Sequence, residues 1–321
     1  MIKFKSTNVR MWSMLGQRGT FGTFMLDLGA NIDNLMVLTG DLAKSSGLDR
    51  FKTSYPDQFL NIGIAEQNMV GIAAGLAKEG HVVFATTFAP FATMRSLEQV
   101  KVHMGYMGFN VKLVGLASGL ATGVLGNTHY GMEDLALIRA IPNLVLLSPA
   151  DCVEVAKATE AAAIYHGPVY LRLTGIMNNP VIYKDDYNFE IGKAITLLQG
   201  SDITIIATGS MVYQALKAAK LLDERSISAS VVNMHTIKPI DTSVIDEACN
   251  KKLIVTVEEH NVIGGLGGAV SEYKSSINNA PRQLFIGIPD TFPKVGDYQY
   301  LLEQNGLTAS QIAERILSEL D

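Results

Sequence analysis

The chain has 321 residues and a net charge of −5, with 48% hydrophobic and 18% charged residues. This composition is typical of a globular protein with a large buried core, and it excludes a chain that is mostly disordered. The length accommodates about two domains, and the acidic balance without a basic block argues against nucleic acid as a partner.

Several features indicate a protein of the cytoplasm. The N-terminal segment lacks the hydrophobic core of a signal peptide, and no apolar run approaches the length that a membrane-spanning helix needs. The two cysteines, Cys152 and Cys249, lie far apart and lack metal-ligand spacing, so we expect buried thiols in a reduced compartment. We therefore expect a cytoplasmic protein without membrane contact and without metal ligands of its own.

Apolar strand runs and helical segments alternate through the first part of the chain. The expected strands cover residues 35–39, 81–87, 110–116, 144–147 and 168–173. The expected helices cover residues 11–30, 61–77, 91–107, 133–140 and 148 to about 165. We expect a loop at residues 47–58 because Pro56 blocks a helix, and a hydroxyl cap at Ser148 opens the last helix. The alternation predicts a mostly parallel, doubly wound α/β sheet.

A polar stretch at residues 174–192 has the character of a linker, and the alternation then restarts. The expected strands of this second part cover residues 203–208, 228–232, 253–257 and 283–288. Its expected helices cover residues 211–222, 241–250, a segment after 264–268, and the C-terminal segment from Thr308. We therefore predict two doubly wound, mostly parallel-sheet α/β domains at residues 1–180 and 193–321, joined by a linker at 181–192.

Glu66 is the only charged residue in the run from Asn61 to Ala77. The helix expected here is apolar nearly all round, which is typical of a core or interface helix. A buried carboxylate must be paired, hydrogen-bonded or protonated, and this stretch offers no nearby Lys or Arg. Two interpretations stay open: Glu66 caps the first turn of its helix, or its partner comes from outside this stretch.

Other residues that could carry chemistry follow predicted strands, where ligands bind in open α/β sheets. His129 lies near the end of a loop rich in Gly, Ser and Thr at residues 117–130, and an imidazole can exchange a proton near neutral pH. Phe88 and Phe91 are either ordinary core residues or an apolar wall for a flat heterocycle. The glycine-rich turn at 264–268 matches neither a dinucleotide nor a nucleotide-phosphate motif, so close helix packing is its expected role.

Taken together and in this order, several motifs resemble the transketolase family. They are Asn61-Ile-Gly-Ile-Ala-Glu-Gln-Asn-Met69, Thr87-Phe-Ala-Pro-Phe91, Gly126-Asn-Thr-His129, Arg139-Ala-Ile-Pro-Asn143 and Gly167-Pro-Val-Tyr170. This set is similar to the pyrimidine-binding domain of a transketolase, while Thr208-Gly-Ser210 and Val257-Glu-Glu259 resemble its C-terminal domain. The resemblance covers nearly the whole chain.

The resemblance implies thiamine diphosphate as the cofactor. In the family, the acid at the position of Glu66 hydrogen-bonds N1′ of the aminopyrimidine, which lets the cofactor lose the proton at its reactive carbon and carry a two-carbon ketol unit from a ketose to an aldose. His129 matches a histidine that handles substrate oxygen atoms. The catalytic residues implied are Glu66 and His129, and the cofactor contacts implied are Asp41, Ile64, Glu66, Phe88 and Phe91.

The resemblance also implies a partner subunit. Transketolases bind the diphosphate and Mg²⁺ or Ca²⁺ through a Gly-Asp-Gly motif in an N-terminal domain, and Gly40-Asp41 lacks the last residue of that motif. We therefore expect the C-terminal subunit of a split transketolase, inactive alone and joined to a separate N-terminal subunit in an α2β2 heterotetramer. The partner subunit is expected to hold most of the metal site.

The sugar-binding positions depart from the family pattern. Ala117, Leu125 and Gly175 stand where the family usually has a histidine, an acid and a phosphate-binding arginine. The remaining candidate substrate contacts are Arg18, Ser45, Arg95 and His129. Because the cofactor half is preserved while the sugar half is altered, we expect a substrate other than the usual pentose phosphates, for example a modified, nucleotide-linked or unphosphorylated sugar.

Three other interpretations stay open. Deoxyxylulose-phosphate synthase shares the Glu66 block, but it normally has an Arg three residues after the second aromatic, where this chain has Met94 followed by Arg95. The beta subunit of a 2-oxoacid dehydrogenase usually has a different acid-containing block, and the Thr-His loop argues against it. A non-catalytic relative would keep the fold without the chemistry, and the retention of Glu66, Phe88 and Phe91 argues against that interpretation.

Overall fold

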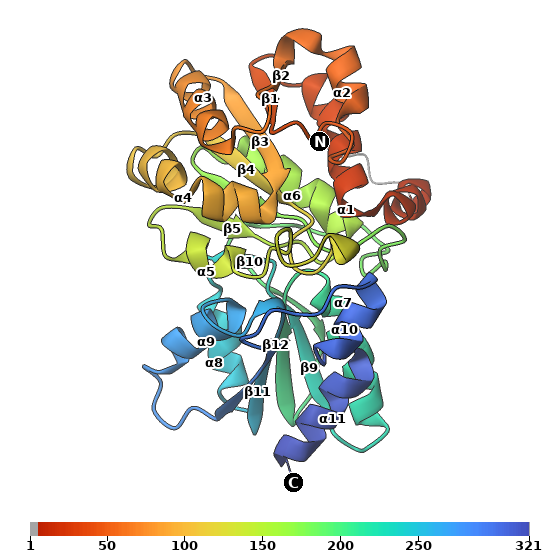
Figure 1. The fold of residues 1–321 in the computed structure, drawn as a ribbon. Coiled ribbons are helices and arrows are strands. Elements are labelled where there is room, and N and C mark those ends of the chain that lie inside the picture. Colours follow the sequence, from red (N-terminus) through yellow and green to blue (C-terminus); the bar gives the residue numbers. More distant parts are fainter. Residues whose placement is uncertain (1–5, 321) are drawn as a thin grey trace.

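A computed structural model describes residues 6–320 as two α/β units, each built around one sheet. Figure 1 shows one unit above the other, with α1 (Ser6–Gly29) in the first and α11 (Ala309–Leu320) at the far end of the second. The first sheet has seven strands and the second has five. The predicted fold class of two mostly parallel α/β domains is confirmed. Between residues 6 and 320, no helix has both the length and the apolar character needed to cross a membrane.

The first sheet has the strand order β10-β5-β6-β4-β3-β1-β2, and its neighbours are parallel except for β10. Its strands are β1 (Leu35–Thr39), β2 (Phe59–Asn61), β3 (Val82–Phe88), β4 (Val111–Leu116), β5 (Val145–Leu147), β6 (Val169–Arg172) and β10 (Thr236–Lys238). Strands β4, β5 and β6 are buried along their whole length, as expected for parallel strands that are covered on both faces.

Helices cover both faces of this sheet. They are α1 (Ser6–Gly29), α2 (Asp49–Ser54), α3 (Glu66–Lys78), α4 (Leu97–Gln99), α5 (Asp134–Arg139) and α6 (Cys152–Ile164), with the 3₁₀ turns η1 (Pro56–Gln58) and η4 (Gly123–Leu125) and the π-helical turns η2 (Phe91–Arg95) and η3 (Val100–Tyr106). Strand side chains alternate between the faces: Val83 and Ala85 pack with α3, η3 and α5, while Phe84 packs with α1 and α6.

The second sheet has the order β12-β11-β8-β9-β7 and is parallel except for β7. Its strands are β7 (Ile195–Leu198), β8 (Ile203–Ala207), β9 (Ala229–Asn233), β11 (Leu253–Asn261) and β12 (Arg282–Ile288). Its helices are α7 (Met211–Asp223), α8 (Thr242–Ala248), α9 (Leu266–Lys274), α10 (Tyr298–Gln304) and α11 (Ala309–Leu320). Helices α7, α10 and α11 pack on one face, and α8 and α9 pack on the other.

The structure corrects the expected loop at residues 47–58. This stretch contains α2 and η1. Pro56 opens η1 instead of preventing helical turns, because a proline fits the first helical position, where its missing N–H costs nothing. The helix expected at 91–107 is helical, but it consists of η2, α4 and η3.

The structure also corrects the cap of α6. The Asp151 side chain, not Ser148, caps the helix by accepting a hydrogen bond from the Glu154 amide at 2.9 Å. Ser148 is still engaged with the sheet, because its amide donates to the carbonyl of His235 at 2.8 Å.

Strand β10 was not predicted, and it crosses the predicted domain boundary. Its residues belong to the second part of the chain, yet they pair antiparallel with β5 in the first sheet, with Thr236 opposite Leu147. The sequence of β10 is too short to identify its partner, because only the folded chain brings it beside β5.

The two sheets meet through the carboxyl ends of their parallel strands. Gly209, just after β8, donates its amide to the carbonyl of Ser148 at 3.2 Å, just after β5. Asn261, at the end of β11, donates its amide to Met132 in the segment that follows β4, at 2.8 Å. Since ligands bind beyond the carboxyl ends of parallel strands, this region is where a functional site is expected.

Candidate active site

Four of the predicted site residues lie at or beyond the carboxyl ends of four neighbouring strands of the first sheet. Asp41 comes shortly after β1, Glu66 follows the turn after β2, Phe88 ends β3, and His129 lies in the loop after β4. The order β4-β3-β1-β2 is continuous and parallel. All four residues are therefore brought to the same edge of the sheet.

Glu66 is the first residue of α3 and is 2% exposed. Both of its carboxylate oxygens accept hydrogen bonds from Nη1 of Arg95 at 2.8 Å, and the Thr87 hydroxyl lies 3.4 Å from Oε1. The partner that the surrounding sequence lacked therefore comes from this chain, 29 positions away. Glu66 also lies in the first turn of α3, where the helix dipole favours an acid.

Arg95 ends η2, and its guanidinium carbon lies 4.0 Å from the centroid of the Phe91 ring. A cation over an aromatic face is favourable. The Arg95 side chain is 43% exposed, so it can change conformer without opening the core. Glu66 and Arg95 thus form an ion pair between a buried acid and a base that faces solvent.

Phe88, Phe91 and His129 form one aromatic cluster. The ring centroids of Phe88 and Phe91 are 6.2 Å apart, and the His129 ring lies 6.0 Å from Phe88 and 5.4 Å from Phe91. The interplanar angles of 63°, 77° and 70° describe edge-to-face contacts, which aromatic rings prefer. The structure therefore brings His129, which arrives on a separate loop, against the predicted aromatic wall.

Asp41 and Ile64 lie in the two loops that follow β1 and β2. The Asn61 amide nitrogen donates to Asp41 Oδ1 at 2.9 Å, and the Asn61 amide oxygen accepts from the backbone of Asp41 at 3.2 Å and of Gly63 at 3.0 Å. These bonds tie the two loops together. Asp41 has a φ of 60°, and Ile64 is 76% exposed, so an apolar side chain stands open beside the site.

Arg18 and Ser45 come from α1 and from the turn after β1. The two segments touch at Gly47, where a Cβ would lie 3.3 Å from the Arg18 carbonyl oxygen. Burial lowers the pKa of Arg18. Substrate contact by either residue stays a prediction.

Comparison with known proteins assigns the chain to a family. The family model described as "Transketolase, pyrimidine binding domain" matches residues 14–177, and "Transketolase, C-terminal domain" matches residues 192–312. The chain belongs to the transketolase family. Every predicted site residue of this transketolase-family chain lies within the pyrimidine-binding range.

Related proteins match over nearly the full length of both chains in each comparison. A protein of Methanocaldococcus jannaschii named as a transketolase C-terminal section is 42% identical, with coverage of 95% of this chain and 96% of that protein. A 6-deoxy-6-sulfo-D-fructose transketolase subunit of a Clostridium species is 39% identical, with coverage of 92% and 91%. An apulose-4-phosphate transketolase subunit of Phocaeicola vulgatus is 39% identical, with coverage of 95% and 97%.

A solved structure has the same architecture. It is described as a split gene transketolase, an inactive β4 tetramer, and it is 38% identical with a TM-score of 0.85. The similarity covers 95% of this chain and 98% of that chain.

The residues present fit the aminopyrimidine end of thiamine diphosphate. Such a heterocycle needs an acid for its ring nitrogen and an apolar wall for its face, and Glu66 lies beside Phe91 through their shared contact with Arg95. Gly40 lies close to this acid, since a Cβ there would lie 3.2 Å from the hydroxyl oxygen of Thr87, which is next to Glu66. Among residues 6–320, no group of three or more His, Cys, Asp or Glu is arranged to hold a metal ion.

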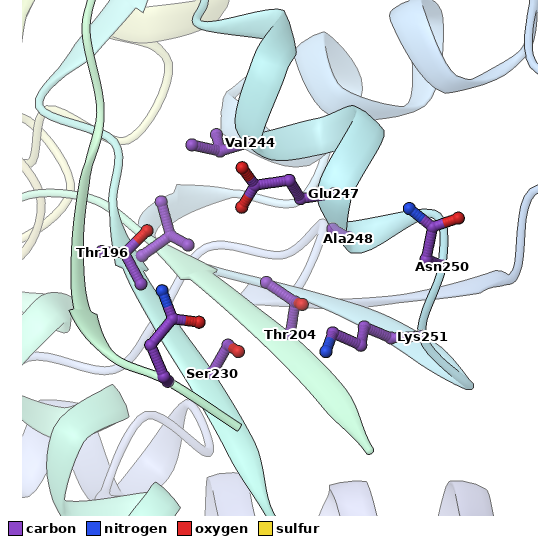
Figure 2. A pocket seen from close by; sticks show the side chains of 10 residues that line it. Thr196, Thr204, Ser230, Val244, Glu247, Ala248, Asn250 and Lys251 are labelled. Atoms are coloured by element: carbon purple, nitrogen blue, oxygen red, sulfur yellow. The ribbon is translucent and has the colours of Figure 1, made fainter. Parts of the chain in front are cut away.

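A separate pocket of about 250 Å³ lies in the second unit (Figure 2). Its walls include Thr204 and Ser230 from the sheet, and Glu247 and Lys251 from α8 and the turn after it. It lies over a face of the second sheet instead of beyond the carboxyl ends, and none of the predicted site residues lines it. We therefore do not connect it with the candidate active site.

Arg172 and Asp134 form a buried ion pair that was not predicted from the sequence. Arg172 Nε donates to both oxygens of Asp134 at 3.0 and 2.8 Å, and Arg172 Nη2 donates to the Glu259 carbonyl at 2.8 Å. The side chains of Arg172 and Asp134 are fully buried. The sequence signal for Arg172 is a charge at the end of an apolar strand, because a buried charge needs a partner.

Proposed function

We propose that this chain is the C-terminal subunit of a thiamine diphosphate-dependent, transketolase-like enzyme. The reaction proposed is transfer of a two-carbon ketol unit from a ketose to an aldose. The observation that carries the proposal is the buried carboxylate of Glu66 at the carboxyl edge of the sheet, beside the aromatic cluster of Phe88, Phe91 and His129. Membership of the transketolase family supports it.

Each site residue has a proposed role. Thiamine diphosphate, when bound, supplies a nucleophilic carbon and an electron sink. Glu66 would share a proton with a ring nitrogen of the pyrimidine through a hydrogen bond, and Phe88 and Phe91 would orient the ring. Asp41 and Ile64 would line the cofactor region from their tied loops. His129 would hold and orient substrate oxygen atoms, because its ring reaches the aromatic cluster from the loop after β4.

Arg95 sets a condition on this mechanism. It holds both oxygens of Glu66, so a ring nitrogen can bond to Glu66 only if the Arg95 contact opens or is shared. The exposure of the Arg95 side chain makes such a change possible without rearrangement of the fold. Arg95 is thereby available to act next on substrate, in the role predicted from the sequence.

The partner is proposed to be a separate N-terminal subunit that binds the diphosphate and Mg²⁺ or Ca²⁺, in an α2β2 assembly in the cytoplasm. Relatives of matching length are named as a C-terminal section or as one subunit of a transketolase, which supports a divided enzyme. Because the two named relatives at 39% identity act on different sugars, neither substrate transfers to this chain.

The altered positions Ala117, Leu125 and Gly175 support a substrate other than the usual pentose phosphates. Comparing turnover of xylulose 5-phosphate with that of unphosphorylated ketoses in the complex with the N-terminal subunit tests this proposal. Poor turnover of xylulose 5-phosphate is the expected result, and efficient use of ordinary pentose phosphates would refute the proposal.

The deciding experiment replaces Glu66 in the complex with the N-terminal subunit. Glu66→Gln keeps the shape but removes the carboxylate, so exchange of the cofactor C2 proton, followed by NMR, should slow by at least about a hundredfold. Glu79→Gln, an exposed change directly after α3, is the matched control and should have no effect. Exchange at the wild-type rate in the Glu66→Gln complex would show that the assignment of Glu66 is wrong, whereas no exchange above that of free cofactor in the wild-type complex would favour a non-catalytic relative. If the wild-type complex turned over 2-oxoacids and not ketoses, a deoxyxylulose-phosphate synthase-like or 2-oxoacid dehydrogenase-like subunit would be favoured.

A further inference from the structure

The loop that carries His129 is closed at its base and held at its tip. Gly119 and Gly131 exchange backbone hydrogen bonds at 2.8 and 3.0 Å, which closes the loop of residues 119–131. Within it, the Tyr130 hydroxyl donates to the Gly123 carbonyl at 2.7 Å. The base of the loop packs against the segment between Phe88 and Phe91, since a Cβ at Gly131 would lie 2.8 Å from Ala89 Cβ. These contacts do not reach the tip of the loop, which carries His129.

The first external contact of the loop is with Glu259, at the carboxyl end of β11 in the second unit. Its Oε1 accepts from the Leu120 amide at 2.7 Å, and its Oε2 accepts from the Tyr298 hydroxyl at 2.5 Å and from the Ser210 hydroxyl. Glu259 is fully buried, and burial raises the pKa of its carboxyl group while the bonds from Ser210, Tyr298 and Leu120 oppose that rise. The Leu120 amide and the hydroxyls of Ser210 and Tyr298 all donate to the carboxylate of Glu259, which acts only as an acceptor in these bonds.

A glycine lets this contact form. Gly119 has a φ of +67°, and a Cβ there would lie 2.4 Å from Glu259 Oε1. The loop backbone therefore approaches the carboxylate as closely as a glycine permits, in a conformation that other residues adopt only with strain.

The loop makes a second set of contacts with the segment 293–295, which lies between β12 and α10. The Asn127 amide nitrogen donates to the Pro293 carbonyl at 2.9 Å, and the Tyr130 hydroxyl lies 3.3 Å from the Lys294 carbonyl oxygen. At Gly126 a Cβ would lie 2.8 Å from a Val295 methyl group. The loop tip is thus packed against the second unit on both sides of His129 in sequence.

We propose that the second unit positions His129: Glu259 and the segment 293–295 clamp loop 119–131 so that the imidazole stays against Phe88 and Phe91. Glu259 is a positioning residue, since it acts through the Leu120 amide. The inference rests on the proposed function for the role of His129, but the clamp itself is a property of the isolated chain. It gives the C-terminal unit a part in the chemistry of a site whose predicted residues all lie in the first unit.

Two pairs of variants test the clamp. Glu259→Leu removes all three acceptor contacts, whereas Glu259→Gln can still accept from the Leu120 amide and donate to a hydroxyl, so it should rescue the loop. Asn127→Ala removes one half-buried hydrogen bond from an otherwise exposed side chain, so it should keep the fold. Its control is Asn250→Ala, which removes a similar bond from an exposed amide to the Asp246 carbonyl elsewhere in the second unit.

The first measurement is hydrogen–deuterium exchange of the isolated chain. Glu259→Leu and Asn127→Ala should speed exchange in residues 119–131 about tenfold while β11 keeps its protection, because only the loop is released. Glu259→Gln and Asn250→Ala should leave the loop at the wild-type rate. Wild-type loop exchange in both clamp variants would overturn the proposal, and so would equal acceleration throughout the second unit, which marks a merely structural role.

The second measurement is turnover in the complex with the N-terminal subunit. Loss of the clamp should lower kcat about tenfold to a hundredfold with little change in cofactor affinity, since the misplaced group is His129 and the pyrimidine contacts remain. A change in cofactor affinity with kcat preserved would overturn the positioning role. If the wild-type complex has no ketol transfer at all, the proposed function fails, while the exchange measurement still decides whether the clamp exists.

Discussion

The Asp134–Arg172 and Glu66–Arg95 pairs of the first unit differ in what surrounds them. Asp134 and Arg172 are both fully buried, and Asp134 also accepts from the Tyr170 hydroxyl at 2.9 Å and from the Leu135 amide at 3.0 Å. Glu66 is equally buried, but its strong bonds come from Arg95 alone, whose side chain is 43% exposed. One pair is locked by its neighbours, and the other can open from the solvent side.

This difference separates a structural pair from a functional one. Breaking a locked buried pair leaves a charge without water or partner, which is strongly destabilising. Opening the Glu66 pair costs less, because water can reach the arginine and a ligand can replace it at the carboxylate. A partly exposed counterion such as Arg95 therefore makes it easier for a polar ligand to reach a buried carboxylate.

The largest effect is expected when the locked pair is broken. Arg172→Met should lower the free energy of unfolding by about 3 to 5 kcal/mol, because Asp134 stays buried without its cation. Urea unfolding at neutral pH measures this. Arg282→Met is the matched control, since that arginine pairs with Glu319 at the surface, and its effect should stay within about 0.5 kcal/mol. Equal losses in the two variants would contradict the comparison.

His235 extends the comparison to a buried titratable group that forms no ion pair among residues 6–320. Burial lowers the pKa of His235 from 6.5 to about 4, so between those values the unfolded chain binds the proton and the folded chain does not. Stability from this group is present above pH 6.5 and is lost as the pH falls. From pH 7.5 to pH 5 the loss should be about 2 kcal/mol.

Urea unfolding at both pH values checks the His235 contribution. His235→Gln should reduce the acid-side loss by that amount, whereas His166→Gln, at an exposed histidine, should leave the pH dependence unchanged. The same pH dependence in wild type and His235→Gln would show that other groups control acid stability.

The smallest stability effect is expected at the open pair. Arg95→Met should cost about 1 kcal/mol in the isolated chain, because water can take the place of the half-exposed guanidinium at Glu66 and the first turn of α3 still favours the acid. It should also tighten thiamine diphosphate binding in the complex by about fivefold, because a competitor for Glu66 is removed. Calorimetric titration measures the affinity, with the exposed Arg225→Met as the control. Weaker cofactor binding in Arg95→Met would mean that Arg95 assists the cofactor instead of competing with it.

Much of the fold was predictable because strand and helix patterns are local. The parallel strands and the importance of Glu66 follow from apolar runs and from one charge in an uncharged stretch. The Glu66–Arg95 contact was not predictable in this way, since 29 residues separate the partners and the π-helical turn η2 sets the direction of the arginine. The cap of α6 was misplaced for a related reason: Ser148 satisfies the capping pattern, but its backbone amide is committed to His235, next to β10.

Strand β10 bears on how the protein could be divided. The stretch at 174–192 contains no regular helix or strand, so it would be a natural place to divide the chain into two fragments. A fragment that ends there would lose Thr236–Lys238 from the border of the first sheet and leave β5 as an unpaired edge. Unpaired edges recruit other strands and promote aggregation. The two units, although each has its own sheet, are therefore expected to melt in a single transition and to be inherited or engineered as one piece.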